Sequence, residues 1–239
     1  MYFHETWFPV TDVLIVGGSS GIGLEIARAY AQRGARVGIA GRDAARCAAI
    51  AATVNDSAYG LSVDVADPHS VGIGLRDVGN VDRLVITAVE RDMNSIKDYD
   101  IDSAMRLATM KLVGYTTVVH HLLGRFGTDA SILLFGGLAK DRPYAGSTTV
   151  TSVNGAVSTM INTYAIELAP IRVNAIHPGI VGDTPYWSGK DAVLENVRAR
   201  TPTGRLVRTS DVVDASMFLL ENPAINAVNL AVDGGWMLL

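Results

Sequence analysis

Cysteine, charge and long apolar runs are all scarce in this sequence, and each shortage excludes a class of protein. Cys47 is the one cysteine among 239 residues, so an internal disulfide is impossible and a metal site built on thiolates is not expected. We interpret Cys47 as a small, half-buried residue of an alanine-rich helix instead of a reactive nucleophile. Charged residues make up 18% of the chain and the net charge is −4, which argues against nucleic acid and favours a small-molecule partner.

No stretch reaches the roughly 18 uninterrupted apolar residues that a membrane-spanning helix needs. The segment Met1–Thr11 has no basic region and no long apolar run, and it contains Glu5 and Pro9, so it does not resemble a signal peptide. We therefore expect a cytoplasmic protein that does not enter a membrane. Four aromatic side chains in this segment are expected to cover a sheet edge or a subunit contact: Tyr2, Phe3, Trp7 and Phe8.

Short β-rich runs alternate with longer helical runs along the whole chain. The apolar runs predict seven strands, at 12–16, 36–40, 58–63, 83–87, 130–135, 171–176 and 227–232. Helices are predicted between the strands. The first runs from the glycine-rich turn to about Arg33, where Gly34 ends it, and the second covers 43–54 with Asp43 as its cap. Further helices are predicted from Pro68, over 101–125 and over 147–168. Nearly all-apolar strands separated by helices indicate an α/β fold, a doubly wound and mostly parallel sheet with helices on both faces.

The organisation indicates one domain over residues 1–239. Apolar residues make up 49% of the chain, which is enough for a large core, and no proline- or serine-rich linker divides it. The pattern is weakest between Gly182 and Thr203. We expect this segment, 182–203, to form a loop and a helix that cover the substrate.

A glycine-rich turn joins the first strand to the first helix. Such a turn lets the backbone approach a pyrophosphate, while the helix N-terminus supplies N–H donors and the positive end of its dipole. Its position between an apolar strand and a helix makes the pattern specific, and a tight turn without a ligand is the alternative. We expect these residues of the turn to bind the phosphates of a dinucleotide: Gly17, Ser19, Ser20, Gly21, Ile22 and Gly23.

The end of the second strand predicts which dinucleotide is preferred. NAD-binding sites carry an acidic residue about 20 positions beyond the glycines, where it holds the adenosine ribose. This chain has Gly41 there, followed by Arg42, whose guanidinium suits a 2′-phosphate. The sequence therefore predicts NADP in preference to NAD, with a solvated surface arginine as the alternative.

Segments spread over residues 12–236 together resemble the short-chain dehydrogenase/reductase family. Val16–Gly23 resembles its glycine signature with Val16 in place of a threonine, Ile171–Gly179 its strand end beside the nicotinamide, and Leu230–Trp236 its C-terminal strand. The resemblance implies a Rossmann-type fold, a nicotinamide cofactor and a homotetramer or homodimer. It also implies further cofactor contacts along the cleft: Asp64, Val65, Ala88, Asn154, Pro178, Gly179 and Thr184.

The family's catalytic side chains are replaced in this chain. Members that this sequence resembles carry a serine, a tyrosine and a lysine in Tyr-x-x-x-Lys spacing, and an asparagine on the fourth helix. Alignment puts Gly137 at the serine, Val150 at the tyrosine, Asn154 at the lysine and Lys111 at the asparagine. The Asn-Asn-Ala-Gly motif is here Ile86–Val89, a change that we expect to remove polar groups that brace the centre of the sheet.

Lysine and asparagine have thus exchanged helices. We predict that Lys111 returns a cation to the nicotinamide ribose and that the Asn154 amide hydrogen-bonds a ribose hydroxyl. The alternative is drift at both positions, with Lys111 reaching out to solvent. An apolar and roomy substrate pocket is expected between these residues: Gly137, Tyr144, Val150, Tyr186 and Trp187.

Two functions of different classes stay open. The retained phosphate loop, Arg42 and Asp64 favour an NADP-dependent oxidoreductase whose substrate, such as an iminium or a polarised enone, accepts hydride without a tyrosine acid. The lost serine, tyrosine and lysine favour a non-redox use of the fold, as a cofactor-sensing or partner-binding module, a cyclase or an isomerase. The histidines have no metal-ligand spacing with acidic partners, and His177, at a strand end, is expected to face the cleft.

Overall fold

In the computed structural model, which describes residues 11–90 and 92–239, seven strands form one sheet in the order β3-β2-β1-β4-β5-β6-β7. The predicted α/β fold is confirmed, and every neighbouring pair is parallel where a mostly parallel sheet was expected. Every connection contains at least one crossover helix, which is what a parallel pair requires. The strands are β1 (Asp12–Val16), β2 (Arg36–Gly41), β3 (Tyr59–Ser62), β4 (Val81–Ile86), β5 (Phe126–Phe135), β6 (Arg172–Pro178) and β7 (Asn229–Val232).

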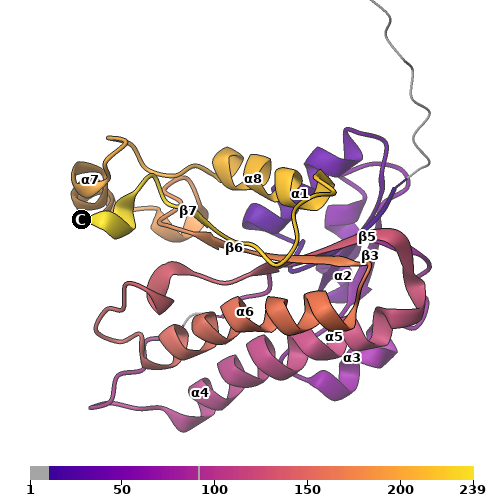
Figure 1. The fold of residues 1–239 in the computed structure, drawn as a ribbon, viewed down its shortest axis with the longest axis horizontal. Helices are drawn as coiled ribbons and strands as arrows, with labels where there is room; N and C mark the ends of the chain where they lie inside the picture. Colours follow the sequence, from indigo (N-terminus) through magenta and orange to yellow (C-terminus); the bar gives the residue numbers. More distant parts are fainter. Residues whose placement is uncertain (1–10, 91) are drawn as a thin grey trace, which may run out of the picture.

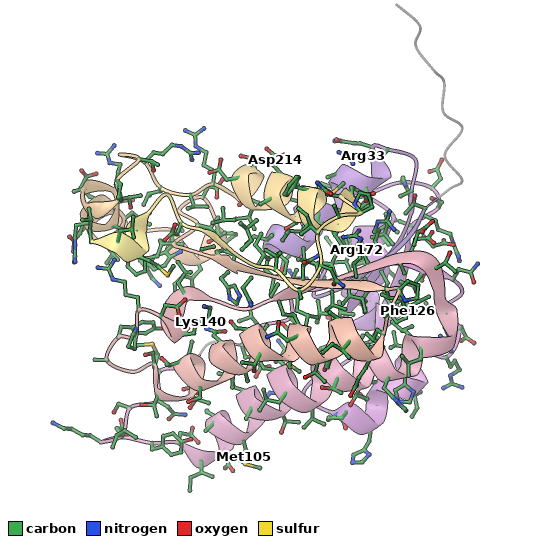
Figure 2. The ribbon with its side chains drawn as sticks, viewed as in Figure 1. Arg33, Met105, Phe126, Lys140, Arg172 and Asp214 are labelled. Carbon is green, nitrogen blue, oxygen red and sulfur yellow. The ribbon has the colours of Figure 1, made fainter. Side chains whose placement is uncertain are left out.

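Helices cover both faces of this sheet, and their side chains fill the space against it (Figures 1 and 2). Successive residues of β1 point to opposite faces: Leu14 and Val16 enter one core, and Val13 and Ile15 enter the other. The first core lies under α3 (Pro68–Gly74), α5 (Tyr115–Leu122) and α6 (Thr148–Glu167). The second lies under α1 (Gly21–Ala31), α2 (Ala44–Ala51) and α8 (Thr209–Glu221).

The predicted helix ends have the expected local causes. Asp43 caps α2, because its carboxylate accepts a hydrogen bond from the Arg46 amide at 2.9 Å. Pro68 occupies the first turn of α3, where a missing amide hydrogen costs nothing. Gly34 follows α1 with φ +81°, a left-handed conformation that ends the helix.

The structure corrects the helix assignments in two places. The predicted helix over 101–125 is divided into α4 (Ile101–Ala108), a π-helical turn at Thr109–Gly114, α5 and a short 3-10 turn. Helix α8 was not predicted, although its buried residues Val212, Ser216 and Leu219 follow helical spacing and would have predicted it.

Two smaller expectations differ in outcome. We expected Cys47 to be half-buried, but it is only 1% exposed, because it lies on the face of α2 that packs into the core. Tyr2, Phe3, Trp7 and Phe8 lie outside the described residues. Within the described part of the chain, none of the helices has the length and apolarity to cross a bilayer.

Candidate cofactor and active site

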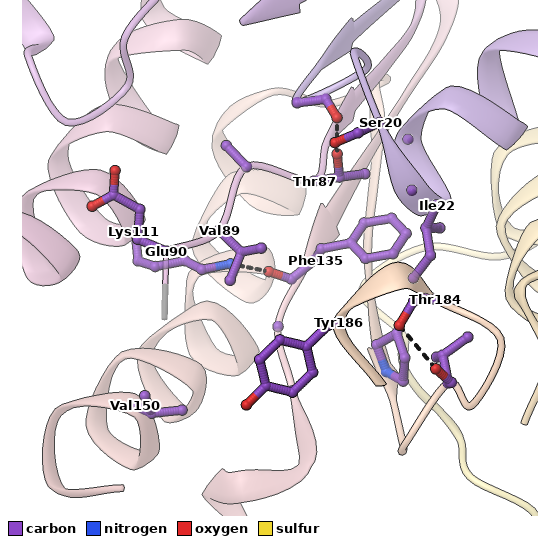
Figure 3. A pocket seen from close by; sticks show the side chains of 18 of the residues that line it. Ser20, Ile22, Thr87, Val89, Glu90, Lys111, Phe135, Val150, Thr184 and Tyr186 are labelled. Atoms are coloured by element: carbon purple, nitrogen blue, oxygen red, sulfur yellow. Dashed lines mark hydrogen bonds between the residues drawn. The ribbon is translucent and has the colours of Figure 1, made fainter. Parts of the chain in front are cut away.

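A cleft of about 1040 Å³ opens at the carboxyl ends of the parallel strands (Figure 3). This volume is at the upper end of the range for ligand pockets, about 300–1,000 Å³. Each residue that the sequence predicted for cofactor, catalysis or substrate lines this cleft, and their roles stay predictions: Gly17, Ser19, Ser20, Gly21, Ile22, Gly23, Arg42, Asp64, Val65, Ala88, Lys111, Gly137, Tyr144, Val150, Asn154, Pro178, Gly179, Thr184, Tyr186 and Trp187.

The glycine-rich turn has the shape that a phosphate cradle requires. Gly17 has φ +91°, and a Cβ on it would lie 2.5 Å from the Thr87 hydroxyl. A Cβ on Gly23 would lie 2.5 Å from the Gly17 carbonyl, so the helix can begin this close to the strand only with glycine there. Gly21 has φ +54° and open space where a Cβ would be, at the first residue of α1. The turn therefore leaves backbone and helix N-terminus open to an anionic ligand, which fits a dinucleotide pyrophosphate.

Thr87 corrects the expectation that the centre of the sheet has lost its polar brace. Its hydroxyl lies 3.1 Å from the Gly17 carbonyl and 3.3 Å from the Val16 carbonyl. These contacts connect the end of β4 to the glycine-rich turn. Thr87 therefore provides a polar contact at the centre of the sheet, although the sequence motif there is altered.

An ion-pair network lies at the end of the cleft where the adenosine was predicted. Arg42 is exposed, yet its guanidinium pairs with the Glu90 carboxylate at 2.6 Å, so it is not a free surface cation. Arg106 binds the same carboxylate through two nitrogens, at 2.7 and 2.8 Å, and contacts Asp64 at 3.3 Å. Glu90 and Arg106 were missed from the sequence, because ion pairs between distant segments leave no local pattern.

Lys111 points inward from the π-helical turn and is 2% exposed, which excludes the alternative that it reaches out to solvent. Its amine donates hydrogen bonds to the Tyr115 phenol oxygen and to the Phe135 carbonyl, both at 2.7 Å; the contact with Phe135 is drawn in Figure 3. Burial lowers the pKa of Lys111 from 10.5 to about 7.

These contacts use two of the hydrogens on the Lys111 nitrogen. An ammonium group keeps one further N–H, and a neutral amine keeps its lone pair, for a group bound in the cleft. Tyr115 was missed from the sequence, although Lys111 and Tyr115 stand four residues apart, the spacing of neighbours on a helix surface. Burial raises the pKa of Tyr115, so its hydroxyl stays protonated and donates to the Ala88 carbonyl at 2.7 Å.

Asn154 occupies the space beside Gly137. A Cβ on Gly137 would lie 2.8 Å from the Asn154 side-chain nitrogen, so the amide would have to move to admit a serine there. Asn154 is 6% exposed, and its side chain makes no hydrogen bond to any of the described residues. A buried amide without a partner that lines a cleft is available to a ligand or to water.

We expected His177 to face the cleft, and that expectation is wrong, because the side chain does not line the cleft. It is 1% exposed, its Nδ1 accepts a hydrogen bond from the Gly137 amide at 3.1 Å, and its Nε2 lies 2.9 Å from Asn229 Oδ1. A Cβ on Gly136 would lie 2.4 Å from the imidazole, which therefore fills the space under the end of β5. Burial lowers the pKa of His177, so the neutral ring braces this strand end.

The segment 182–203 lines the cleft through its first part. Tyr186 and Trp187 pack edge to face at 4.9 Å, and the Lys190 amine lies 3.5 Å from the centre of the Tyr186 ring. The helix predicted in this segment is α7 (Asp191–Arg200). None of its residues lines the cleft, so only the loop before it is placed to cover a substrate. Arg142 and Trp236 also line the cleft, with the guanidinium 4.1 Å from the centre of the ring, a pair that the sequence did not predict.

Comparison with known proteins agrees with this arrangement. The family model described as enoyl-(acyl carrier protein) reductase matches residues 16–237. The 3-oxoacyl-[acyl-carrier-protein] reductase of Bos taurus is 31% identical over 232 residues, which cover 94% of this chain and 97% of that protein. A solved small-chain dehydrogenase in complex with NADPH is 25% identical with a TM-score of 0.80, and covers 97% of this chain and 100% of its own. The 3-ketoacyl-(acyl-carrier-protein) reductase from Brucella melitensis, complexed with NADH, is 27% identical with a TM-score of 0.83 over 95% and 98% of the two chains.

Proposed function

This chain belongs to the short-chain dehydrogenase/reductase family, and we propose that it is an NADP(H)-dependent oxidoreductase that acts on a small conjugated carbonyl compound without a tyrosine proton donor. The observation that carries the proposal is the buried Lys111 amine, which lines the cleft and is held by Tyr115 and Phe135. A cation at this position would repel an iminium ion and would attract the oxygen of a polarised enone, so we favour the enone.

The cofactor half of the proposal rests on the turn at Gly17–Gly23 and on Arg42. The open backbone at Gly21 suits the pyrophosphate, and the Arg42 guanidinium suits a 2′-phosphate. Asp64, Val65 and Ala88 line the same cleft, and we assign them to the adenosine part of the cofactor. The bound cofactor supplies the hydride, and the protein supplies orientation and electrostatics.

The substrate half rests on two nitrogen donors. The Lys111 ammonium has one N–H to spare, and the Asn154 amide has no partner among the described residues. Both line the cleft, so together they would hold the oxygen of a carbonyl group and stabilise the negative charge that develops on it. Lys111 then supplies the proton that the family's tyrosine supplies in relatives, and the space left by Val150 and Gly137 admits a bulky substrate.

The test is Lys111→Met, which keeps the stem and removes the charge, against Lys97→Met, which removes an exposed charge outside the cleft. NADPH-dependent reduction of small conjugated enones is assayed, together with NADPH affinity by calorimetry. We expect Lys111→Met to lose about tenfold or more in turnover or affinity, equivalent to about 1.4 kcal/mol, and Lys97→Met to match the wild type. Unchanged turnover and affinity in Lys111→Met would remove the role of the amine.

The same assay separates the non-redox alternative. A chain that binds NADPH and turns over no enone, ketone or imine of a broad panel would be a cofactor-sensing module. A chain that binds neither NADPH nor NADH would use the fold for another purpose. Turnover of any panel member that depends on NADPH supports the oxidoreductase.

A further inference from the structure

The ion pair between Arg42 and Glu90 crosses the mouth of the proposed cofactor cleft. Arg42 follows β2 and Glu90 follows β4, and these two strands flank β1, whose end continues into the turn at Gly17. The 2.6 Å contact therefore joins two loops over the end of the strand between them. In doubly wound sheets a dinucleotide binds across this point, outside the carboxyl ends of the strands.

Glu90 is held in this position by more than one contact. Arg106 binds both of its carboxylate oxygens, at 2.7 and 2.8 Å, and also reaches Asp64. The hydrogen bond to Glu90 is the main cause that raises the pKa of Arg106, so this guanidinium stays charged. Glu90 is 22% exposed on its side chain and lines the cleft, and Figure 3 shows it on the same wall as Val89.

The pair gives this cofactor site a carboxylate that its second strand lacks. Where NAD-binding sites have an acidic residue, this chain has Gly41, and Arg42 follows. Glu90 brings a carboxylate to Arg42 from the opposite side of β1. A carboxylate accepts hydrogen bonds from ribose hydroxyls, and it repels a phosphate.

We propose that Glu90 determines the cofactor selectivity of this protein, by competing with a 2′-phosphate for Arg42 and by offering its own oxygens to the ribose of an unphosphorylated cofactor. The inference rests on the proposed binding of a nicotinamide dinucleotide and refines it. Arg42 favours the 2′-phosphate and Glu90 opposes it, so the site accepts both NADP(H) and NAD(H) with a moderate preference for the first. Because the Arg42 side chain is 64% exposed, the competition is screened by salt and is strongest at low ionic strength.

Two adenosine fragments test the inference without any turnover. Adenosine 2′,5′-bisphosphate carries the 2′-phosphate and ADP does not, so the ratio of their affinities by calorimetry isolates that group. We expect Glu90→Gln to raise the ratio in favour of the bisphosphate about tenfold at low salt. Glu25→Gln is the matched control, because Glu25 pairs with Arg28 at 2.7 Å on α1 and does not line the cleft. The control should leave the ratio unchanged.

The same ratio of affinities, measured in an Arg42→Ala variant, shows whether Glu90 acts through Arg42. In Arg42→Ala, the bisphosphate loses its preference, and we expect the added Glu90→Gln change to alter the ratio less than about threefold. If Glu90→Gln does not fold, Glu90→Asp keeps a charge for Arg106 and shortens the reach to Arg42, and a partial rise in the ratio is expected.

The outcomes distinguish the inference from the function on which it rests. Binding of both fragments with the same ratio in the wild type, Glu90→Gln and Glu90→Asp overturns the role of Glu90 and leaves the cofactor proposal intact. Failure of folded wild-type protein to bind either fragment overturns the cofactor proposal and the selectivity role together. A tenfold rise that persists in Arg42→Ala contradicts competition for Arg42.

Discussion

The Lys111 amine and the Tyr115 phenol, four residues apart and 2.7 Å from each other, form a buried lysine–tyrosine pair on the helix that follows β4. The order is the reverse of the Tyr-x-x-x-Lys pair that the family carries on the next helix, where this chain has Val150 and Asn154. Tyr115 is fully buried and does not line the cleft, so it holds the amine in position and does not itself contact a substrate. The π-helical turn Thr109–Gly114 directs Lys111 to this place, and such turns are frequent at functional sites.

Lys111 should make the reaction depend on pH near neutrality. Burial lowers its pKa to about 7, so the amine is protonated below that pH and neutral above it. If the ammonium donates the proton in reduction, kcat/KM falls as pH rises through about 7. Rate profiles of the wild type and Lys111→Met check this, and the variant should lose the descending limb. A wild-type profile that is flat between pH 6 and pH 9 would speak against proton donation by this group.

The same lysine should make the folded state more stable at alkaline pH. In the unfolded chain Lys111 has a pKa of 10.5, and burial lowers it to about 7 in the folded chain. Between these values the unfolded chain binds a proton that the folded chain does not, so the free energy of unfolding rises with pH. From pH 7 to pH 9 we expect a gain on the order of 2 kcal/mol that is absent in Lys111→Met. Urea denaturation at both pH values measures it; an equal pH dependence in the two proteins would contradict burial of the amine.

Restoring the family's serine should lower stability because Asn154 occupies its space. A Cβ at position 137 would lie 2.8 Å from the Asn154 side-chain nitrogen, so the buried Asn154 amide must move to admit it. We expect Gly137→Ser to lower the free energy of unfolding by about 1–3 kcal/mol. Asn154→Ala in the same chain should remove most of that loss, and thermal denaturation of the two single variants and the double variant measures the coupling. Additive effects would mean that the two positions do not compete for space.

We expect the protein to form a homotetramer or a homodimer. In the single chain, α4 presents exposed apolar side chains, with Ile101 at 67% and Met105 at 62%, and Figure 2 shows Met105 directed away from the sheet. Leu238 and Leu239 near the C-terminus are also exposed, at 82% and 64%. Large apolar side chains exposed in neighbouring positions, as in each of these two segments, are often covered by a partner. Light scattering at micromolar concentration tests it, and a stable monomer would rule out the assembly.

The strands and the phosphate turn were predictable because their signals are local. Nearly all-apolar runs such as β1 identify buried parallel strands, and the spacing Gly17–Gly23 has one physical reason, the close approach of helix and strand. The π-helical turn has no local signal in the sequence, and its last residue, Gly114, packs so closely on a distant segment that a Cβ would lie 1.9 Å from the Val65 carbonyl. The pairing of Arg42 with Glu90 joins residues 48 positions apart, and no local pattern records it.

The position of Lys111 relative to a bound cofactor tests the central claim most directly. Crystals soaked with NADPH and a small conjugated enone would be examined for the dinucleotide and for the Lys111 amine. We predict density for the pyrophosphate over Gly17–Gly23, with the amine within hydrogen-bond distance of the nicotinamide ribose or of the enone oxygen. A cleft without dinucleotide density at saturating NADPH, or a bound cofactor with the amine still enclosed by Tyr115 and Phe135 and out of reach of both ligands, would contradict it.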